Sequence, residues 1–551
     1  MNIQAAEATP DPARWQQTTP ETLFDHLNAA LMAGADRPFL YFDEETLTYG
    51  ELHRRSLRMA HALQVLGVVA GETVVTILDN SADAVVIWFA INRIGAIWVP
   101  LNTAYKGDFL RHQIADSDAR LLIAEPAYLP HVLALAADLP ALERVLVRGD
   151  DAEGASGPLV IEPLDRWRGA DESPIAHTPQ PEDIACLIYT SGTTGRSKGC
   201  MVSHNYLCNG GRQQNIAIPP LADEVTWSSL PMFHVSTTSY VIIATLIAQA
   251  RARIVSRFSV TTFWDDIEAS GATTAMLMAS MFPLLAEAPD NPAMARCRGQ
   301  LRAVTGVPIT PEVRKVWHER FGVGHMNSFG YGQTEASKIC NLAWGDPLPP
   351  LTSAGQPSVD FEVMIADGKG LPVPAGTVGE ILVRPRRPNI MFAGYWRQSE
   401  QTVKIWRDLW LHTGDLGKFD TEGYMYFVDR QKDYVRSRGE NISSLEVEAV
   451  VMRHEAVSEV AFHVVPSPGV AEDDLKVTIV CLSDAYLSEQ DLWHWLAEEL
   501  PHFAVPRFIE FRDLLPKTPT GRLQKERLRS EGQTPATWDA HAHGLIARRK
   551  R

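Results

Sequence analysis

Apolar residues recur with a helical period in several segments of the chain, and these segments begin at capping residues. In "LTYGELHRRSLRMAHALQVLG", small or apolar residues occupy positions 52, 56, 59, 60, 63 and 66, Thr48 and Glu51 have the spacing of a capping box, and Gly67 marks the expected end. The stretch "SADAVVIWFAINRIG" predicts a second helix between a Ser81 cap and Gly95, with the β-rich runs "ETVVTIL" and "AIWVPL" on either side. This alternation predicts a parallel sheet, so the first part of the chain belongs to the α/β class.

The pattern changes at about residue 355, where short strands are separated by Pro, Gly and Asp. The run "GEILVRP" predicts one of these strands, and "DTEG" within "KFDTEGYMYFV" predicts a hairpin turn between two others. A compact α+β pattern follows "DRQKDYVRSRGEN", with helix-like "SSLEVEAVVMRH" and "SEQDLWHWLAEEL" and strand-like "VSEVAFHVV" and "KVTIVCL". We therefore expect a large N-terminal domain of α/β subdomains over residues 1–430 and a small, mobile α+β C-terminal domain over residues 431–551. The polar stretch "RGDDAEGASG" at 148–157 is expected to be a connector.

Composition narrows the range of partners. The 551 residues exceed what one hydrophobic core supports, and a formal net charge of −16 argues against a nucleic-acid partner, since the basic run "RRKR" is confined to the end of the chain. The six cysteines form no Cys-x-x-Cys pair, so neither a disulfide framework nor a structural zinc site is indicated. No apolar run is long enough to span a membrane. These features favour a cytoplasmic protein without membrane insertion.

A strand running into a loop of glycines and hydroxyls is the first chemical motif. The stretch "IACLIYTSGTTGRSKG", residues 184–199, offers inward-facing backbone amides, the hydroxyl groups of Thr190, Ser191, Thr193 and Thr194 and the charge of Lys198, which together suit a polyphosphate. It is not a Walker loop, because only two residues separate Gly192 from Gly195 and Lys198 is followed by glycine. A plain surface loop is the alternative, and the density of hydroxyl groups disfavours it.

This stretch closely resembles the phosphate-binding signature of the adenylate-forming superfamily, which includes the acyl-CoA synthetases. The resemblance extends along almost the whole chain and implies the superfamily's fold. It assigns phosphate binding to Thr190, Ser191, Gly192, Thr193, Thr194, Gly195 and Lys198.

A second signature is similar to "FGYGQTE", residues 329–335. The resemblance places Phe329, Gly330 and Tyr331 beside the adenine, Thr334 on the α-phosphate and Glu335 on Mg²⁺. The segment "TGVPI" resembles the one that covers the other adenine face, with Gly306, Val307 and Pro308. The cofactors implied are ATP or AMP, bound as the acyl-adenylate, together with Mg²⁺.

Further motifs follow in the superfamily's order. "WLHTGD" resembles the ribose-binding segment with Asp415, and "FVDRQKD" adds Arg430 beside it and Lys432 at the hinge. "VRSRGEN" around Gly439 resembles the strip that lines the pantetheine tunnel of coenzyme A after the small domain has rotated. "LPMFH" resembles the gate of the acid site and ends in His234, for which a core position stays the alternative. The implied activity is a ligase that joins a carboxylic acid to CoA through an acyl-adenylate, by domain alternation.

The last signature departs from the superfamily pattern. In "PKTPTGRLQK", Arg522 occupies the place of the lysine that enters the active site during adenylation. A guanidinium is larger and planar, so we expect adenylation to be weak or absent and the thioester-forming step to be intact. A companion adenylating ligase could then supply the acyl-adenylate. Ser197, where the superfamily commonly has proline, is a smaller departure that affects loop stiffness.

Two alternatives stay open. The chain is a complete ATP-dependent acyl-CoA synthetase if Arg522 or Lys525 performs the lysine's task, and a non-catalytic acyl- or adenylate-binding protein if neither step operates. The acid pocket is expected to include "MLMASM" (276–281), His234 and residues near Gly306 and Gly330. This mixture of methionines and small residues is compatible with a bulky apolar acid or an aryl acid, whose identity stays open.

Overall fold

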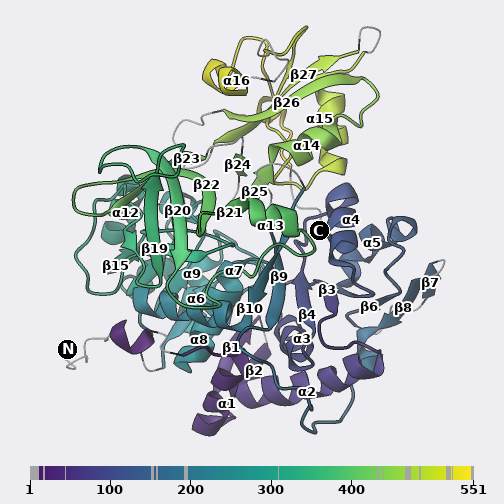
Figure 1. Ribbon diagram of the computed structural model, residues 1–551, viewed down its shortest axis with the longest axis vertical. Coiled ribbons are helices and arrows are strands. Elements are labelled where there is room, and N and C mark those ends of the chain that lie inside the picture. Colours follow the sequence, from purple (N-terminus) through teal and green to yellow (C-terminus); the bar gives the residue numbers. More distant parts are fainter. Residues whose placement is uncertain are drawn as a thin grey trace.

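The computed structural model describes residues 12–16, 19–43, 45–149, 154–156, 159–190, 196–221, 223–307, 309–430, 434–437, 440–465, 473–482, 486–516, 523 and 525–547. Figure 1 shows a large body that holds most of the chain and a smaller C-terminal unit above it. This arrangement confirms the predicted fold class, which is a large α/β part followed by a small α+β part. None of the helices in the described ranges is long and apolar enough to cross a membrane.

One sheet of the large body has the strand order β10-β9-β4-β3-β5-β6-β8-β7. Its strands are β3 (Thr73–Ile77), β4 (Ile97–Pro100), β5 (Leu121–Ala124), β6 (Arg144–Val147), β7 (Gly154–Ser156), β8 (Leu159–Pro163), β9 (Ile184–Thr190) and β10 (Lys198–Ser203). The strands from β9 to β8 in this order are parallel, as predicted. Residues 154–156, predicted as part of a connector, instead pair with β8, because a nearby antiparallel edge satisfies their backbone groups.

The helices of this sheet begin where the sequence predicts. Helix α2 (Tyr49–Val65) carries the complete capping box of Thr48 and Glu51, and α3 (Ala82–Arg93) is capped by the Ser81 hydroxyl. Helix α3 is buried along nearly its whole length, because it lies between two sheets.

The second sheet has the order β15-β14-β13-β11-β12-β1-β2. Its strands are β1 (Pro38–Phe42), β2 (Glu45–Thr48), β11 (Val225–Ser228), β12 (Arg251–Ile254), β13 (Thr274–Met276), β14 (Ala303–Thr305) and β15 (His325–Asn327). One apolar core joins both sheets through α3 and α6 (His204–Ala217). The remaining longer helices of the large body are α1 (Leu23–Gly34), α4 (Gly107–Ser117), α9 (Phe263–Ser270), α10 (Met281–Glu287), α12 (Pro311–Phe321) and α13 (Ser399–Ile405).

Antiparallel strands complete the large body beside the small unit. They are β16 (Gly330–Gln333), β17 (Ser337–Asn341), β18 (Gln356–Pro357), β19 (Phe361–Ala366), β20 (Gly379–Pro385), β21 (Trp406–Arg407), β22 (Trp410–Phe419) and β23 (Met425–Arg430). The predicted turn "DTEG" does join β22 to β23 as an antiparallel pair.

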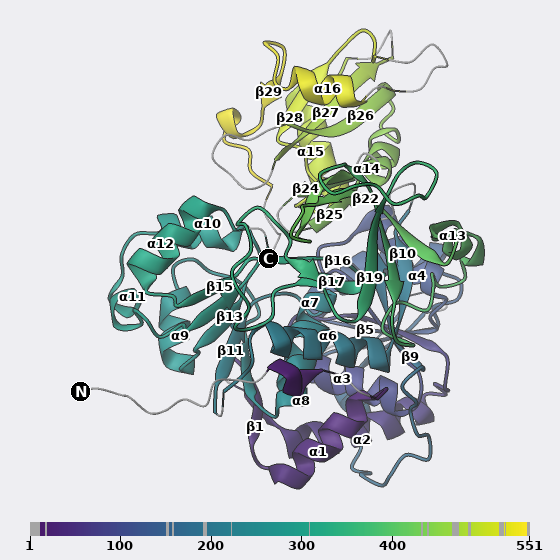
Figure 2. The same ribbon diagram turned by 60° about the vertical axis from the view of Figure 1, so that its left-hand side comes forward.

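The small unit has a core of its own. It contains β26 (Val457–Val465), β27 (Asp474–Cys481), β28 (Phe508–Phe511), β29 (Trp538–Asp539), α14 (Ser444–Val451), α15 (Glu489–Glu499) and α16 (Lys525–Glu531). Phe109 of α4 also packs into this core, and Lys106 Nζ donates to the Ala497 carbonyl at 2.8 Å. The hairpin β24 (Tyr434–Ser437) and β25 (Glu440–Ser443) lies between the small unit and the large body (Figure 2). The small unit is therefore docked on the large body.

Helix α6 packs closely on a π-helical segment, η5 (Thr238–Ile243). A Cβ atom on Gly211 would lie 2.9 Å from the Ala244 backbone nitrogen and 3.1 Å from the Ile243 carbonyl carbon. Because these neighbours are backbone atoms, they have no side-chain rotation that could relieve the contact. The absence of a side chain at Gly211 therefore fixes how η5, which follows His234, lies against the core.

We expect Gly211→Ala to lower the free energy of unfolding by about 1–3 kcal/mol through overpacking. Gly368→Ala is the matched control, since nothing lies within 4 Å of a Cβ at that turn. Urea unfolding of the two variants measures the difference. Equal stabilities would show that α6 and η5 are not held by this contact.

Candidate active site

Tyr331 and Asp415 form the first part of the site. The Tyr331 hydroxyl donates a hydrogen bond to Asp415 Oδ2 at 2.8 Å, and the Asp415 backbone amide is bound by Thr413 Oγ1 at 3.1 Å. Asp415 is buried and pairs with Arg430 in the register of β22 and β23. The residues predicted beside the adenine and on the ribose are thus neighbours. Phe427, which the sequence analysis missed, stacks on Tyr331 with ring centroids 6.0 Å apart.

Glu335 and Lys198 meet at Tyr395. The Tyr395 hydroxyl donates to Glu335 Oε1 at 2.7 Å, and Lys198 Nζ lies 4.8 Å from the centroid of the same ring. Both Glu335 and Lys198 are buried. Thr334 is fixed through its carbonyl oxygen, which accepts from the Tyr206 hydroxyl at 2.8 Å. The structure therefore brings the predicted phosphate cation and the predicted metal ligand to one place.

The residues around Glu335 fit a magnesium ion that is shared with phosphates. One carboxylate oxygen is held by the Tyr395 hydroxyl, which orients the group. Mg²⁺ in such sites takes one or two carboxylates and completes its shell with phosphate oxygens and water. When bound, the ion would neutralise charge that builds up on the phosphates.

The segment predicted to cover the adenine is tightly packed. A Cβ on Gly306 would lie 2.2 Å from the Phe282 ring and 2.8 Å from the Leu277 carbonyl oxygen, and Val307 lies next to Gly330. Phe329 points inward, since only 2% of its surface is exposed, and the Arg314 guanidinium covers its ring at 5.5 Å. Phe329 therefore lies in the packed interior beside Arg314.

His234 contacts the β24–β25 hairpin, which lies between the large body and the small unit. Its Nε2 lies 3.0 Å from Glu440 Oε2 at the start of β25. The side chain is 34% exposed, so a core position does not describe it. The hairpin β24–β25 is therefore docked against the segment predicted to gate the acid site.

Ser197 makes a second contact between the two parts of the chain. Its backbone N–H donates to the Glu446 carboxylate of α14, and its hydroxyl accepts from Gln113 Nε2 at 3.1 Å. Burial raises the pKa of Glu446 to about 7. A proline at position 197 would have no N–H to donate. The departure from the superfamily pattern at this position thus permits a hydrogen bond to the small unit.

Lys525 is engaged within the small unit. Its ammonium lies 2.6 Å from Glu448 Oε1 and 2.8 Å from Ser444 Oγ, and the residue is buried. Ser444 and Glu448 lie on α14 and Lys525 lies on α16, so the ion pair joins the two helices. In this arrangement Lys525 is a structural cation.

Several predicted site residues lie outside the described residues. They are Ser191, Gly192, Thr193, Thr194, Gly195, Pro308, Lys432, Gly439 and Arg522, together with the side chain of Arg430. Thr190 ends β9 at the edge of the predicted phosphate loop.

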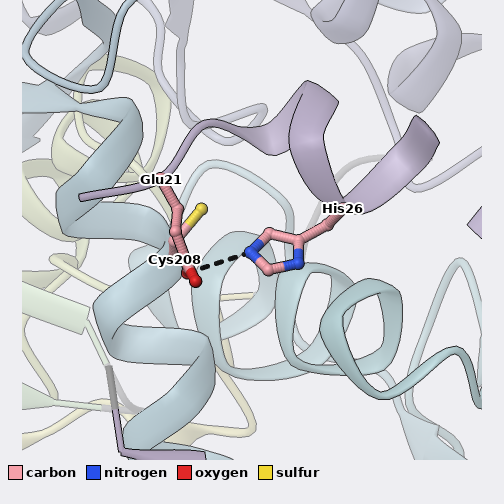
Figure 3. A group of neighbouring side chains, drawn as sticks. All are labelled: Glu21, His26 and Cys208. Carbon is pink, nitrogen blue, oxygen red and sulfur yellow. Dashed lines mark hydrogen bonds and ion pairs between the residues drawn. The ribbon is translucent and has the colours of Figure 1, made fainter. Parts of the chain in front are cut away.

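A separate group of possible metal ligands involves α1 and α6. Glu21, His26 and Cys208 have ligand atoms within 4.8 Å of one another (Figure 3). Arg212 donates to both oxygens of the Glu21 carboxylate, whose pKa of about 2 reflects the hydrogen bonds from His26 and Arg212 outweighing burial. Burial raises the pKa of the Cys208 thiol well above its usual value. The Glu21 carboxylate is therefore already paired with Arg212, and the Cys208 thiol beside it is neutral. We describe this group as a structural contact.

Comparison with known proteins decides the family. The model of the AMP-binding enzyme family matches residues 28–396, and that of the AMP-binding enzyme C-terminal domain matches residues 446–522. The chain belongs to the AMP-binding enzyme family.

Individual relatives agree with this assignment. A feruloyl-CoA synthase of an Amycolatopsis species is 31% identical over 484 residues, which cover 88% of this chain and 93% of the relative. A double mutant of o-succinylbenzoate CoA synthetase from Bacillus subtilis, bound with a product analogue, superimposes with a TM-score of 0.79 at 24% identity, over 93% and 99% of the two chains. An anthranilate CoA ligase in complex with anthranoyl-AMP gives 0.69 at 26% identity, over 94% and 98%. The protein is an acid–thiol ligase of the acyl-CoA synthetase type.

For this ligase we expect Asp415→Ala to weaken binding of a non-hydrolysable acyl-AMP analogue tenfold or more, because the ribose loses its carboxylate partner. The rise in melting temperature on adding the analogue should shrink. Asp346→Ala, at an exposed aspartate, is the control. An undiminished rise with Asp415→Ala would remove Asp415 from the site.

Lys525→Met should lower the free energy of unfolding of the ligase by about 3 kcal/mol, since it takes the ammonium partner from the half-buried Glu448 carboxylate. Adding Glu448→Gln should recover part of the loss, because glutamine still accepts the Phe462 amide that Glu448 binds at 2.7 Å. Chemical unfolding measures both changes. Unchanged stability together with lost adenylation would make Lys525 the catalytic cation instead.

Proposed function

We propose that the ligase forms the CoA thioester of a carboxylic acid through an acyl-adenylate, with an intact thioester-forming step and a weak adenylation step. The observation that carries the proposal is the combination of Arg522 at the lysine position with a neighbouring Lys525 already bound to Glu448 and Ser444. Lys525 is thus engaged within the small unit in this arrangement.

Adenylation is the step that needs a compact cation. A carboxylate oxygen attacks the α-phosphorus of ATP, the bond to the bridging oxygen breaks, and pyrophosphate leaves. The family lysine bridges the two anions as a point charge, whereas a guanidinium spreads its charge over a planar fork. Losing one such contact in the transition state costs about 3–4 kcal/mol, or two to three powers of ten in rate.

The thioester-forming step relies on other residues. The CoA thiolate attacks the acyl carbonyl carbon, and AMP leaves with the bonding electron pair. Asp415 and Tyr331 would hold the nucleotide, and Glu440 at His234 brings the β24–β25 hairpin to the acid gate. The hydrogen bond from Ser197 to Glu446 stabilises this docking.

The acid is proposed to have a bulky apolar or aryl body. Met276, Leu277 and Met281 are buried beside Phe282 and Gly306. The names of two similar proteins, feruloyl-CoA synthase and anthranilate CoA ligase, refer to aryl acids. Such walls exclude water from the acyl group and leave few polar contacts to select it.

The complete ATP-dependent synthetase is the second candidate, because Glu335, Lys198 and Asp415 all occupy fitting positions. A companion adenylating ligase belongs only to the first candidate, to which it would supply acyl-AMP. A cytoplasmic location stays a prediction. The non-catalytic binding protein does not fit a chain whose relatives are CoA ligases.

Arg522→Lys should raise ATP/pyrophosphate exchange with the true acid by tenfold or more and leave thioester formation from synthetic acyl-AMP nearly unchanged. The reason is that the lysine restores the point charge in the first step and is rotated away in the second. Arg527→Lys, at an exposed arginine of α16, is the matched control and should change neither assay.

Equal effects of Arg522→Lys on both assays would contradict the division of labour between the two steps. Exchange by the unmodified ligase at ordinary rates, about 1–1,000 per second, would select the complete synthetase.

A further inference from the structure

Lys338 is a lysine inside the large body that the proposed reaction does not use. It belongs to β17 and follows Glu335 by three positions. Its Nζ lies 2.5 Å from Gln214 Oε1 and 4.5 Å from the centroid of the Tyr240 ring. Both contacts are with neutral groups.

Among the residues that the structure describes, no carboxylate lies within 4.0 Å of the Lys338 ammonium. Burial lowers the pKa of this lysine to about 7. A buried charge without a counter-ion is costly, and proteins usually pair such groups or neutralise them. A lysine kept at such a position is a candidate for binding a ligand anion.

The surroundings of Lys338 are those of the acid site. Gln214 Nε2, on the amide that Lys338 binds, donates to Thr305 Oγ1 at 3.4 Å, and Thr305 immediately precedes Gly306. Tyr240 belongs to η5, which follows His234, and its hydroxyl lies 3.2 Å from Ser337 Oγ. Three segments that carry predicted site residues, at His234, Gly306 and Glu335, therefore converge on Lys338.

Lys338 also keeps an accessible part. Its side chain is half-buried, whereas its neighbours Ser337 and Ile339 on the strand are buried. Part of the Lys338 residue is therefore reached by solvent, whereas the adjoining strand residues are not. The apolar residues Met276 and Met281, the latter the first residue of α10, are buried in the same core as Leu277 and Phe282 at Gly306, so the body of a ligand here would be in apolar surroundings.

We propose that Lys338 binds a second carboxylate at the far end of the acid, so that the substrate class is dicarboxylic acids with an apolar or aryl body. A neutral hydrogen-bond acceptor on the ligand would add little to binding, because Gln214 Oε1 already accepts from the Lys338 ammonium at 2.5 Å. A ligand anion would instead supply the negative charge that balances this ammonium. Only the near carboxylate forms the bond to the α-phosphorus and releases pyrophosphate, while the far carboxylate stays free. This inference rests on the proposed function and narrows its substrate.

Matched acids that differ only at the far end test it: terephthalate against 4-methylbenzoate, and adipate against hexanoate. Their synthetic mono-adenylates are supplied with CoA, so that the result is independent of Arg522. The unmodified ligase should prefer the carboxylate member of an accepted pair by tenfold or more in kcat/KM. Lys338→Met should abolish or reverse this preference, and Lys369→Met, at an exposed turn, should preserve it.

Stability against pH gives a readout independent of turnover. The folded pKa of Lys338 lies below its value of about 10.4 in the unfolded chain, so the unfolded state binds more protons between about pH 7 and pH 10. The penalty for burying the ammonium is full below pH 7 and decreases as pH rises. The groups that face it are the Gln214 amide and Tyr240, whose pKa burial raises to about 12, so neither titrates in this window. Lys338→Met should therefore raise the melting temperature most at pH 7 and progressively less toward pH 10.

The outcomes separate the two claims. The inference is overturned if thioester formation proceeds but the methyl members are preferred, or if Lys338→Met keeps the same preference for diacids. If no adenylate yields a thioester, the proposed function fails, and calorimetric binding of the same acid pairs to the unmodified and Lys338→Met proteins decides the inference. Equal binding of diacid and methyl analogue would then overturn it.

Discussion

A carboxylate and a polyphosphate repel each other at bonding distance, and the cations near the cleft must overcome this repulsion. Two unit charges 4 Å apart interact by about 4 kcal/mol at the effective dielectric constant of a protein surface, and by more where water is excluded. The position and free charge of each lysine therefore decide which reaction the site can perform. Lys198 lies on Tyr395 beside Glu335 and is suited to the phosphates. Lys525 has its charge balanced by Glu448 and stabilises the small unit. Lys338 faces only neutral groups among the described residues and suits a substrate anion.

The two cores of the chain provide the second constraint. The small unit buries its own apolar residues, from Val435 to Ala540, and Phe109, Ala104 and Tyr105 of the large body pack against them. A unit with its own core can rotate without unfolding, as domain alternation requires. Besides this apolar packing, polar contacts hold the small unit here, among them Glu440 with His234, Glu446 with Ser197, and Lys106 with the Ala497 carbonyl. Such contacts can be exchanged for others at small cost, which fits an enzyme that uses two arrangements in one cycle.

Local patterns in the sequence predicted the parts of the fold that depend on local chemistry. The capping boxes, the alternation around β3, α3 and β4, and the hairpin between β22 and β23 all follow from residue types at fixed spacing. The contact of Tyr331 with Asp415 could be expected only through the family resemblance, because the two residues are 84 positions apart. Three features were not predicted. They are the contacts of Tyr395 with Glu335 and Lys198, the ion pair of Lys525 with Glu448, and the isolation of Lys338 from carboxylates. Each depends on which side chains tertiary packing brings together, and no spacing rule encodes the absence of a counter-ion.

The division between the two half-reactions is tested most directly by rapid-quench kinetics on the unmodified ligase. The protein is mixed with ATP and its acid, and acyl-AMP is quantified over time; in a parallel series, preformed acyl-AMP is mixed with CoA, and the thioester is quantified. Acyl-AMP should form at least a hundred times more slowly than CoA consumes it. This factor is the lower end of the loss in rate estimated for one missing transition-state contact. Acyl-AMP that accumulates faster than CoA can consume it would contradict the account.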